Sequence, residues 1–449
     1  MTATTVTERR VASGRLHRSF GIWFGIAVGV GGMIGAGILR APADVAARLP
    51  SPGLFLGAWV LGGVYALLGA NAIAELATMV PRSGGQYVFI RHALGPFAGF
   101  VVGLNEWLAA CASVTALAIV EAEAIGALLT PFARYVVPIA ALSLVVTGAV
   151  LLRGVRQSDQ AQRYTSVIKA LVLLTLVVAC FLWRAFRGAP QTTVVTTLAP
   201  ALGASLVLAM ITALQGVIFA YDGWTGVVYF SGEVKNPDRD IPRALVGGLL
   251  STMALYLLLN AAFLAVLPIS AIASSPLAAA TAASVPFGRH GGTVVHLLVA
   301  LALPSALVAN CLMASRTAFA LAEDGLAPRR LAQVNAGGTP GGALIASVIA
   351  MGLFLLSGSV ERLIALCAVM FVATYTMSFA SVFVLRWREP DAIRPYRSRW
   401  HPWTTGFVLV CSLAFLAAMV ASDLRLGVAG VAVLVLSYPL YRLIARRRG

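Results

Sequence analysis

The stretch GVGGMIGAGIL (Gly29–Leu39) decides the fold, because it places five glycines inside an apolar segment long enough to cross a membrane. Within a helix, each glycine costs about 1 kcal/mol relative to alanine. Two explanations fit a membrane helix weakened in this way. Small residues at GxxxG spacing, such as Gly31 with Gly35, let neighbouring helices pack closely. Alternatively, the helix is interrupted here and its free backbone groups line a cavity.

The composition is that of an integral membrane protein. Of the 449 residues, 59% are hydrophobic and 11% are charged, whereas ordinary soluble domains are about 25% charged. Apolar segments of about 20 residues can span a bilayer as helices, and here they are continuously apolar rather than alternating. We predict an all-α membrane protein with twelve transmembrane helices, at residues 20–47, 53–79, 96–130, 134–152, 164–183, 202–231, 242–267, 292–322, 341–357, 361–386, 403–421 and 426–444.

The lysines and arginines predict the orientation in the membrane. With the N-terminus inside, the cytoplasmic segments carry 23 of them, the opposite side carries 7, and three remain within spans. Because positive residues favour the cytoplasmic side, we expect a multi-pass protein of the plasma membrane with both termini in the cytoplasm. The same distribution explains the net charge of +16, because the positive residues set the orientation and contact anionic lipid at the cytoplasmic surface. We therefore expect no nucleic-acid partner.

A second interruption lies in the sixth span, QGVIFAYDGWTGVVYF (Gln215–Phe230), where Asp222 and Gly223 stand in the middle of an apolar run. Interrupted segments at corresponding places of two halves point to a transporter binding site. The breaks, near residues 35 and 222, therefore predict two inverted five-helix repeats. The predicted parts are a cytoplasmic N-terminal tail (1–19), a first repeat (20–185), a second repeat (202–388), two further helices (403–444) and a cytoplasmic tail (445–449).

The two breaks suit a zwitterionic amino acid. A half-helix N-terminus presents N–H groups and a partial positive charge, which favour a carboxylate. A half-helix C-terminus presents carbonyl groups, which favour an ammonium group. An amino acid needs both, so one substrate can lie between the two broken helices.

Charged side chains at membrane depth are further candidates for function. Lys169 could contact carbonyls freed at the first break and replace a bound sodium ion, and it could also lose its proton on desolvation and so couple transport to protons. Alternatively, it could snorkel to the cytoplasmic face. Asp222 could attract a substrate cation, or it could only accept N–H groups that hold its own break open. Arg40 could pair with Glu361 and close the outer mouth, or it could reach the membrane interface.

Four segments carry a family resemblance: GGMIGAGIL (Gly31–Leu39), ANAIAELATMVPRSGGQYVF (Ala70–Phe89), FAYDGWTGVVYFSGEVKNPDRDIPRAL (Phe219–Leu245) and SRTAFALAEDGLAPRRLAQVNAGGTP (Ser315–Pro340). With these segments, residues 20–390 or so resemble the amino acid–polyamine–organocation (APC) superfamily of transporters. The resemblance is strongest to its L-amino acid transporter and bacterial amino acid permease branches. It implies the LeuT-type fold, with helices 1 and 6 broken within a 5+5 inverted repeat, followed by helices 11 and 12.

The resemblance also implies roles for single residues. The substrate carboxylate would meet the segment Ile34, Gly35, Ala36 and Gly37. The substrate amino group would meet Phe219, Ala220 and Asp222. Phe219 would be the aromatic gate, Arg40 resembles an outer-gate arginine, and Lys169 with Asn310 would form the coupling site. Ala36 stands where many relatives have serine, so backbone N–H groups would have to suffice there.

Together these features predict a secondary active amino acid permease that moves neutral L-amino acids by alternating access. We expect it to be sodium-independent and either proton-coupled or an exchanger. A polyamine, organic-cation or cationic amino acid antiporter is the alternative, although such a site should hold several acids and only Asp222 is well placed. The five histidines are scattered, so we expect no enzyme, no metal site and no cofactor.

The cysteines bear on accessory subunits. All five lie in apolar runs and none in a predicted outer loop. We therefore expect no disulfide-linked partner, and a protein that acts as a monomer or weak dimer.

Overall fold

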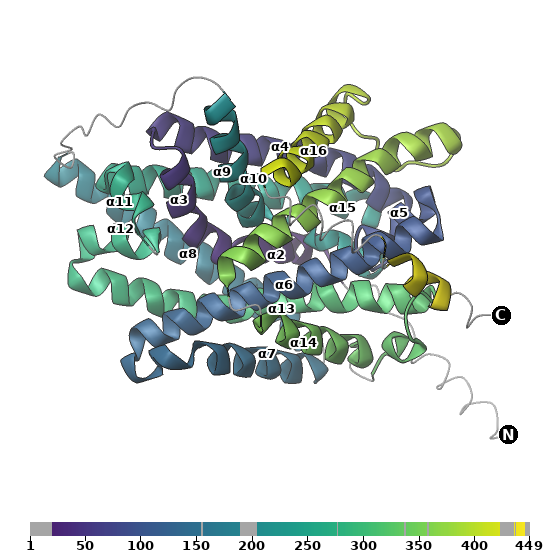
Figure 1. Cartoon of the computed structure of the whole chain (residues 1–449), viewed down its shortest axis with the longest axis horizontal. Helices are drawn as coiled ribbons and strands as arrows, with labels where there is room; N and C mark the ends of the chain where they lie inside the picture. Colours follow the sequence, from purple (N-terminus) through teal and green to yellow (C-terminus); the bar gives the residue numbers. More distant parts are fainter. Residues whose placement is uncertain are drawn as a thin grey trace.

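The computed structural model describes residues 20–153, 156–188, 204–275, 277–335, 338–356, 359–422, 435 and 437–444. Within these residues the regular structure is helical, apart from one isolated bridge between Phe20 and Val234. The helices lie mostly along the long axis of the molecule (Figure 1). The all-α fold predicted from the sequence is confirmed.

In the described part of the chain, nine helical segments are long and apolar enough to cross a membrane, and the bent pair of α2 (Ile22–Met33) and α3 (Ala36–Arg48) makes a tenth. The nine are α4 (Pro52–Met79), α6 (Pro96–Leu128), η2 (Thr130–Tyr135) with α7 (Val136–Leu152), α8 (Arg156–Arg187), α9 (Ala204–Tyr221) with η3 (Gly226–Glu233), α10 (Pro237–Val266), α13 (Arg289–Glu323), α15 (Val360–Arg388) and α16 (Trp403–Ser422).

Two of the twelve predicted spans need comment. The span predicted at 341–357 corresponds to α14 (Gly341–Leu355), which has 15 residues. At 1.5 Å per residue it is about 22 Å long, shorter than the roughly 30 Å of a hydrocarbon core. The span predicted at 426–444 falls largely outside the described residues. The part of it that is described includes residues 437–444, which are helical.

Short helices fill the connections. The loop after α4 holds α5 (Tyr87–Leu94), and the connection between α10 and α13 holds α11 (Ile269–Ala273) and α12 (Ala278–Phe287). A further short helix, η4 (Arg329–Ala332), follows α13. In Figure 1, α11 and α12 lie at the same end of the bundle as α3, whereas α5 lies at the opposite end.

Helix starts follow local chemistry. Gly95 adopts a φ of 91° directly before Pro96, the first residue of α6. Proline suits this position because the first N–H groups of a helix have no intrahelical partner. α10 likewise begins with proline, and its first turn carries Asp238 and Asp240, which complement the positive end of the helix dipole.

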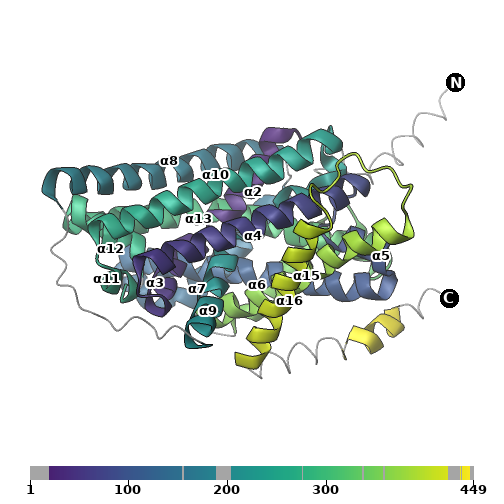
Figure 2. The ribbon, with the colours of Figure 1, turned by 90° about the horizontal axis from the view of Figure 1, so that it is seen from above.

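The broken helices lie inside a frame of long unbroken ones. α13 packs along α6, and α15 packs on α6 as well. On the other side, α10 packs against α2, α4 and α8, an arrangement visible in Figure 2. α3 packs against α9, so the fold brings the two interrupted spans together.

Candidate functional site

The first break separates α2 from α3. α2 ends at Met33, Ile34 and Gly35 leave the helix, and α3 begins at Ala36. The two halves are bent by 45°. Gly35 is the N-cap of α3, and no side chain caps the first N–H groups of this helix. These N–H groups are therefore available to a ligand. The break therefore lies where the glycines of the sequence predicted it.

The second break follows α9. The helix ends at Tyr221, residues 222–225 form a turn, and the span continues as the 3₁₀-helix η3. Gly223 has a φ of +102°, a conformation that glycine adopts without a steric penalty. Phe219 and Ala220 are buried in the last turn of α9.

The two breaks touch each other. A Cβ atom added to Gly223 would lie 2.8 Å from the carbonyl carbon of Gly32, and one added to Gly37 would collide with Ala220. The buried Tyr256 of α10 joins the same two segments. Its hydroxyl oxygen lies 2.6 Å from the carbonyl oxygen of Met33 and 2.9 Å from that of Ala220. Glycine and tyrosine thus hold the interrupted backbones in direct contact.

Lys169 reaches the first break from α8. Its side chain is buried, and its Nζ lies 3.5 Å from the carbonyl oxygens of both Gly31 and Ile34. An ammonium group at membrane depth is costly unless it finds partners. The carbonyls freed by the break provide them, so Lys169 is directed inward rather than toward the membrane surface.

Asp222 is held at the second break by α15. Its carboxylate accepts a hydrogen bond of 2.5 Å from the hydroxyl of Tyr375. Its own N–H donates to the carbonyl of Ile218 at 2.9 Å. The acid is therefore tied to both α15 and the last turn of α9.

Arg40 bridges two acids at the end of the bundle where α3 lies. Its guanidinium donates to Glu361 of α15 at 3.2 Å and also to Glu123 of α6. Pairing with Glu361 is the arrangement considered from the sequence. Glu123 is an addition, and the three side chains together link α3, α6 and α15.

The sequence comparisons bear on all of these residues. The chain matches the family described as "Amino acid permease" over residues 20–436. It belongs to the amino acid permease family. The permease is 27% identical over 433 residues to the serine/threonine exchanger SteT of Bacillus subtilis, covering 93% of this chain and 96% of that protein.

Two mammalian transporters are similar over most of the permease. The b(0,+)-type amino acid transporter 1 of Mus musculus is 26% identical, over 88% of this chain and 81% of that protein. The large neutral amino acids transporter small subunit 2 of Rattus norvegicus is 28% identical, over 88% of this chain and 75% of that protein. The predictions of the superfamily and of an amino acid transporter are thereby confirmed.

The opposite end of the permease is also bridged. The fully buried Arg316 of α13 lies 3.5 Å from Glu233 at the end of η3 and stacks over the Phe230 ring. Ser83, in the loop after α4, donates to the same Glu233. The N–H of Phe20 bonds to the Glu233 carbonyl at 3.0 Å. These contacts join the residues just before α2, the loop after α4, α13 and η3 at the end away from Arg40.

A second ion cluster of the permease joins the loop after α4 to the end of α13. Arg82 donates to Glu323 and Asp324 at 3.3 and 3.2 Å. Partial burial acts to lower the pKa of Arg82, but the Asp324 and Glu323 carboxylates outweigh it and raise that pKa. The Arg82 guanidinium therefore stays charged and fixes the loop after α4 to the end of α13.

Sequence reasoning singled out most residues of the breaks but missed their tyrosine partners. Tyr256 and Tyr375 lie in apolar runs far along the chain, and a buried tyrosine hydroxyl usually finds a partner. That rule marks them as candidates without saying which carbonyl or acid they meet. Asn310 on α13 is buried and donates to the carbonyl of Ala306 on its own helix. This contact does not test the coupling role predicted for Asn310.

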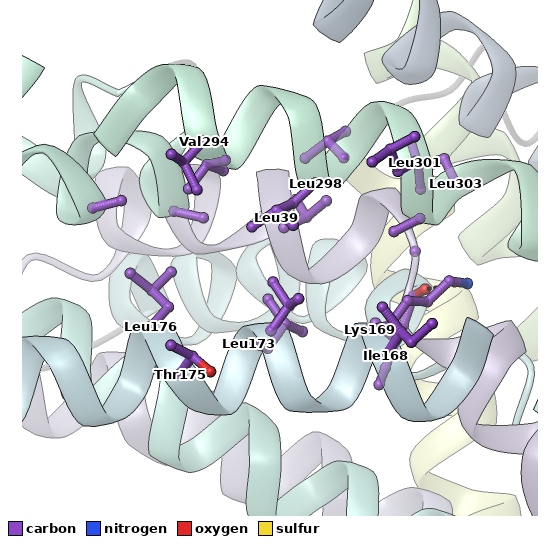
Figure 3. A pocket seen from close by; sticks show the side chains of 18 of the residues that line it. Leu39, Ile168, Lys169, Leu173, Thr175, Leu176, Val294, Leu298, Leu301 and Leu303 are labelled. Atoms are coloured by element: carbon purple, nitrogen blue, oxygen red, sulfur yellow. Dashed lines mark hydrogen bonds between the residues drawn. The ribbon is translucent and has the colours of Figure 1, made fainter. Parts of the chain in front are cut away.

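An apolar cavity adjoins the first break. It has a volume of about 480 Å³, and α8 and α13 form two of its walls (Figure 3). Ile34, Gly35 and Lys169 are among its lining residues. The cavity therefore lies on the α8 side of the first break, whereas Ala220 of the second break contacts Gly37.

Proposed function

We propose that this permease carries neutral L-amino acids across the plasma membrane by alternating access. The observation that supports it is the direct meeting of a half-helix N-terminus, at Gly35–Gly37, with a half-helix C-terminus, at Phe219–Ala220. Such a pair offers N–H groups to a carboxylate and carbonyls to an ammonium group at the depth of the membrane.

In this proposal the backbone recognises what all amino acids share. The segment Ile34, Gly35, Ala36 and Gly37 binds the carboxylate, and Phe219, Ala220 and Asp222 surround the amino group. Because Ala36 has no hydroxyl, backbone N–H groups carry the anion. Phe219 closes over the substrate as an aromatic gate.

Lys169 takes the place of a sodium ion in the proposed mechanism. A sodium ion would bind carbonyl oxygens at this break, and the Lys169 ammonium already lies 3.5 Å from two of them. Transport is then independent of sodium and driven by exchange or by protons. Asn310 contributes to the same coupling site from α13.

Two bridged ends fit alternating access. We place the Arg40 end outside and the Arg316 end in the cytoplasm, as the distribution of positive residues predicts. Opening outward would then separate Arg40 from Glu123 and Glu361. Opening inward would separate Arg316 from Glu233.

The substrate class is proposed on the names of the relatives. The printed names include a serine/threonine exchanger and a transporter of large neutral amino acids, and both describe uncharged side chains. A cationic amino acid, a polyamine or an organic cation is the second candidate, because Asp222 is an acid at the break. Its carboxylate is already engaged by Tyr375, which favours the neutral class.

Uptake into proteoliposomes tests the proposal. Labelled amino acids with neutral, cationic and anionic side chains, together with a polyamine, are offered at two pH values, with sodium or choline outside. We expect saturable uptake of neutral amino acids. The uptake should increase when the vesicles contain the same unlabelled amino acid, and it should not change when choline replaces sodium outside. Absence of saturable uptake across the panel would refute the proposed transport, and uptake that required sodium would refute the role of Lys169.

A further inference from the structure

The apolar cavity beside the first break is a groove on the flank of the bundle. Figure 3 shows α8 along one side and α13 along the other, with Leu173 and Leu176 facing Val294 and Leu298 across the space. From Val294 to Leu303 the groove follows ten residues of α13, which is about 13.5 Å of helix rise. It is long, narrow and parallel to the spans.

The lining offers almost nothing to water. Among its side chains, Lys169 and Thr175 alone carry polar groups. Thr175 donates its hydroxyl to the carbonyl of Leu171 at 2.9 Å, and Lys169 faces the carbonyls of the break. A cavity water needs two to four polar partners, so the groove selects a hydrocarbon occupant.

One long side of the groove opens toward the membrane. Ile168, Val294 and Leu301 line it, yet they are 57%, 47% and 67% exposed. The neighbouring Leu171 and Leu174 of α8 are exposed as well, and only 28% of the apolar stretch of α8 is buried. In a membrane-spanning helix such a surface faces lipid, so the groove continues the lipid-contacting surface inward.

We propose that the groove binds one acyl chain of a membrane phospholipid, which enters between α8 and α13 and lies against Leu39 and Gly35. Val294 lies five residues, or about 7.5 Å of rise, after the first residue of α13. The chain can therefore lie in the groove while its headgroup remains at the membrane surface. The bound chain packs against α3 directly beside the break, so it supports one position of this half-helix.

Retention of lipid by the purified protein tests the proposal. Wild-type protein in detergent is incubated with dioleoyl phosphatidylglycerol, and bound lipids are counted by native mass spectrometry. In Ala302→Phe a ring fills the groove, so we expect one lipid fewer than in the wild type. Leu297→Phe is the matched control, because Leu297 is an exposed residue of α13 outside the lining, and it should retain the wild-type number.

A second variant separates lipid loss from misfolding. Thr175→Cys is modified with N-phenylmaleimide after purification, so the groove is filled in a protein that has already folded. Leu174→Cys, on the lipid-facing side of the same helix, is modified in parallel. We expect the first adduct to lose one lipid and the second to keep it.

Equal lipid counts for wild type, folded Ala302→Phe and the Thr175→Cys adduct would overturn the proposal. The proposal rests on the groove and on the membrane, and does not depend on which substrate is carried. Its readout is a lipid count, so it can fail while transport is observed, and it can succeed in a preparation without transport.

Discussion

Lys169 places a positive charge against the open backbone of the first break, with Nζ 3.5 Å from the carbonyls of Gly31 and Ile34. These contacts are longer than ordinary hydrogen bonds of 2.7–3.2 Å, so the attraction is mainly that of a charge to two dipoles. Buried charges at membrane depth persist where they serve a function or find partners. Here one partner, Ile34, belongs to the segment that we propose binds substrate, and the other, Gly31, lies in the last turn of α2.

Removing the charge of Lys169 should slow transport. We expect Lys169→Met, which keeps much of the side-chain volume, to lower uptake at least about tenfold, a rise of roughly 1.4 kcal/mol in the activation free energy of transport. Uptake into proteoliposomes measures it, with Leu174→Met on the lipid-facing side of α8 as control. Wild-type uptake by Lys169→Met would contradict a coupling role of the lysine and leave it only a structural contact with the first break.

The two acids around Arg40 should contribute unequally. The Glu123 side chain is 37% exposed and that of Glu361 is 73% exposed. Exposed ion pairs are worth about 0–1 kcal/mol, and the partner that is less exposed is screened less by water and salt. We expect Glu123→Gln to change the exchange rate several-fold and Glu361→Gln by less than about twofold. Equal effects of the two variants on exchange would contradict this order.

At the scale of the helix, the contact between the broken spans depends on Tyr256. Its one hydroxyl lies within 3 Å of the carbonyls of Met33 and Ala220, so its removal leaves buried acceptors without a donor. Such a group costs about 1–3 kcal/mol. We expect Tyr256→Phe to lower both the melting temperature and the rate of transport.

Tyr65→Phe is the matched control for Tyr256→Phe. The Tyr65 hydroxyl lies 2.8 Å from the Ser412 hydroxyl on α16, away from both breaks. This variant also loses a hydrogen bond and should lower the melting temperature, but transport should persist. If both variants lose transport to the same degree, the effect of Tyr256 is one of stability alone.

The same elements show what the sequence could predict. The glycines of Gly29–Leu39 and the Asp222–Gly223 pair predicted both breaks. The free-energy cost of glycine in a helix, and of an acid within the membrane, can be judged from the local sequence alone. The contact between the breaks was predicted only through the idea of a shared substrate, since it depends on how α10 holds α2 and α9 together. The partners Tyr375 and Glu123 are 153 and 83 residues from Asp222 and Arg40, and no local pattern specifies such pairs. For the same reason the groove between α8 and α13 was not predicted.

At the scale of the whole molecule, both ends of the bundle are tied in this structure. Arg40 links α3 to α6 and α15 at one end, and Glu233 links η3 to Arg316 and Ser83 at the other. A transporter that opens alternately must break one set while the other holds. Which end faces the cytoplasm is therefore the question on which the direction of every proposed step depends.

Accessibility of single cysteines decides the orientation. Arg134 lies in η2, Arg329 lies in η4, and both are exposed. Because positive residues gather on the cytoplasmic side, we expect a membrane-impermeant maleimide to label Arg134→Cys in intact cells and to label Arg329→Cys only after the membrane is permeabilised. The parent chain is the control, since four of its five cysteines are buried and the fifth, Cys411, is partly buried. Labelling of Arg329→Cys in intact cells, with Arg134→Cys protected, would invert the molecule and place Arg40 at the cytoplasmic mouth.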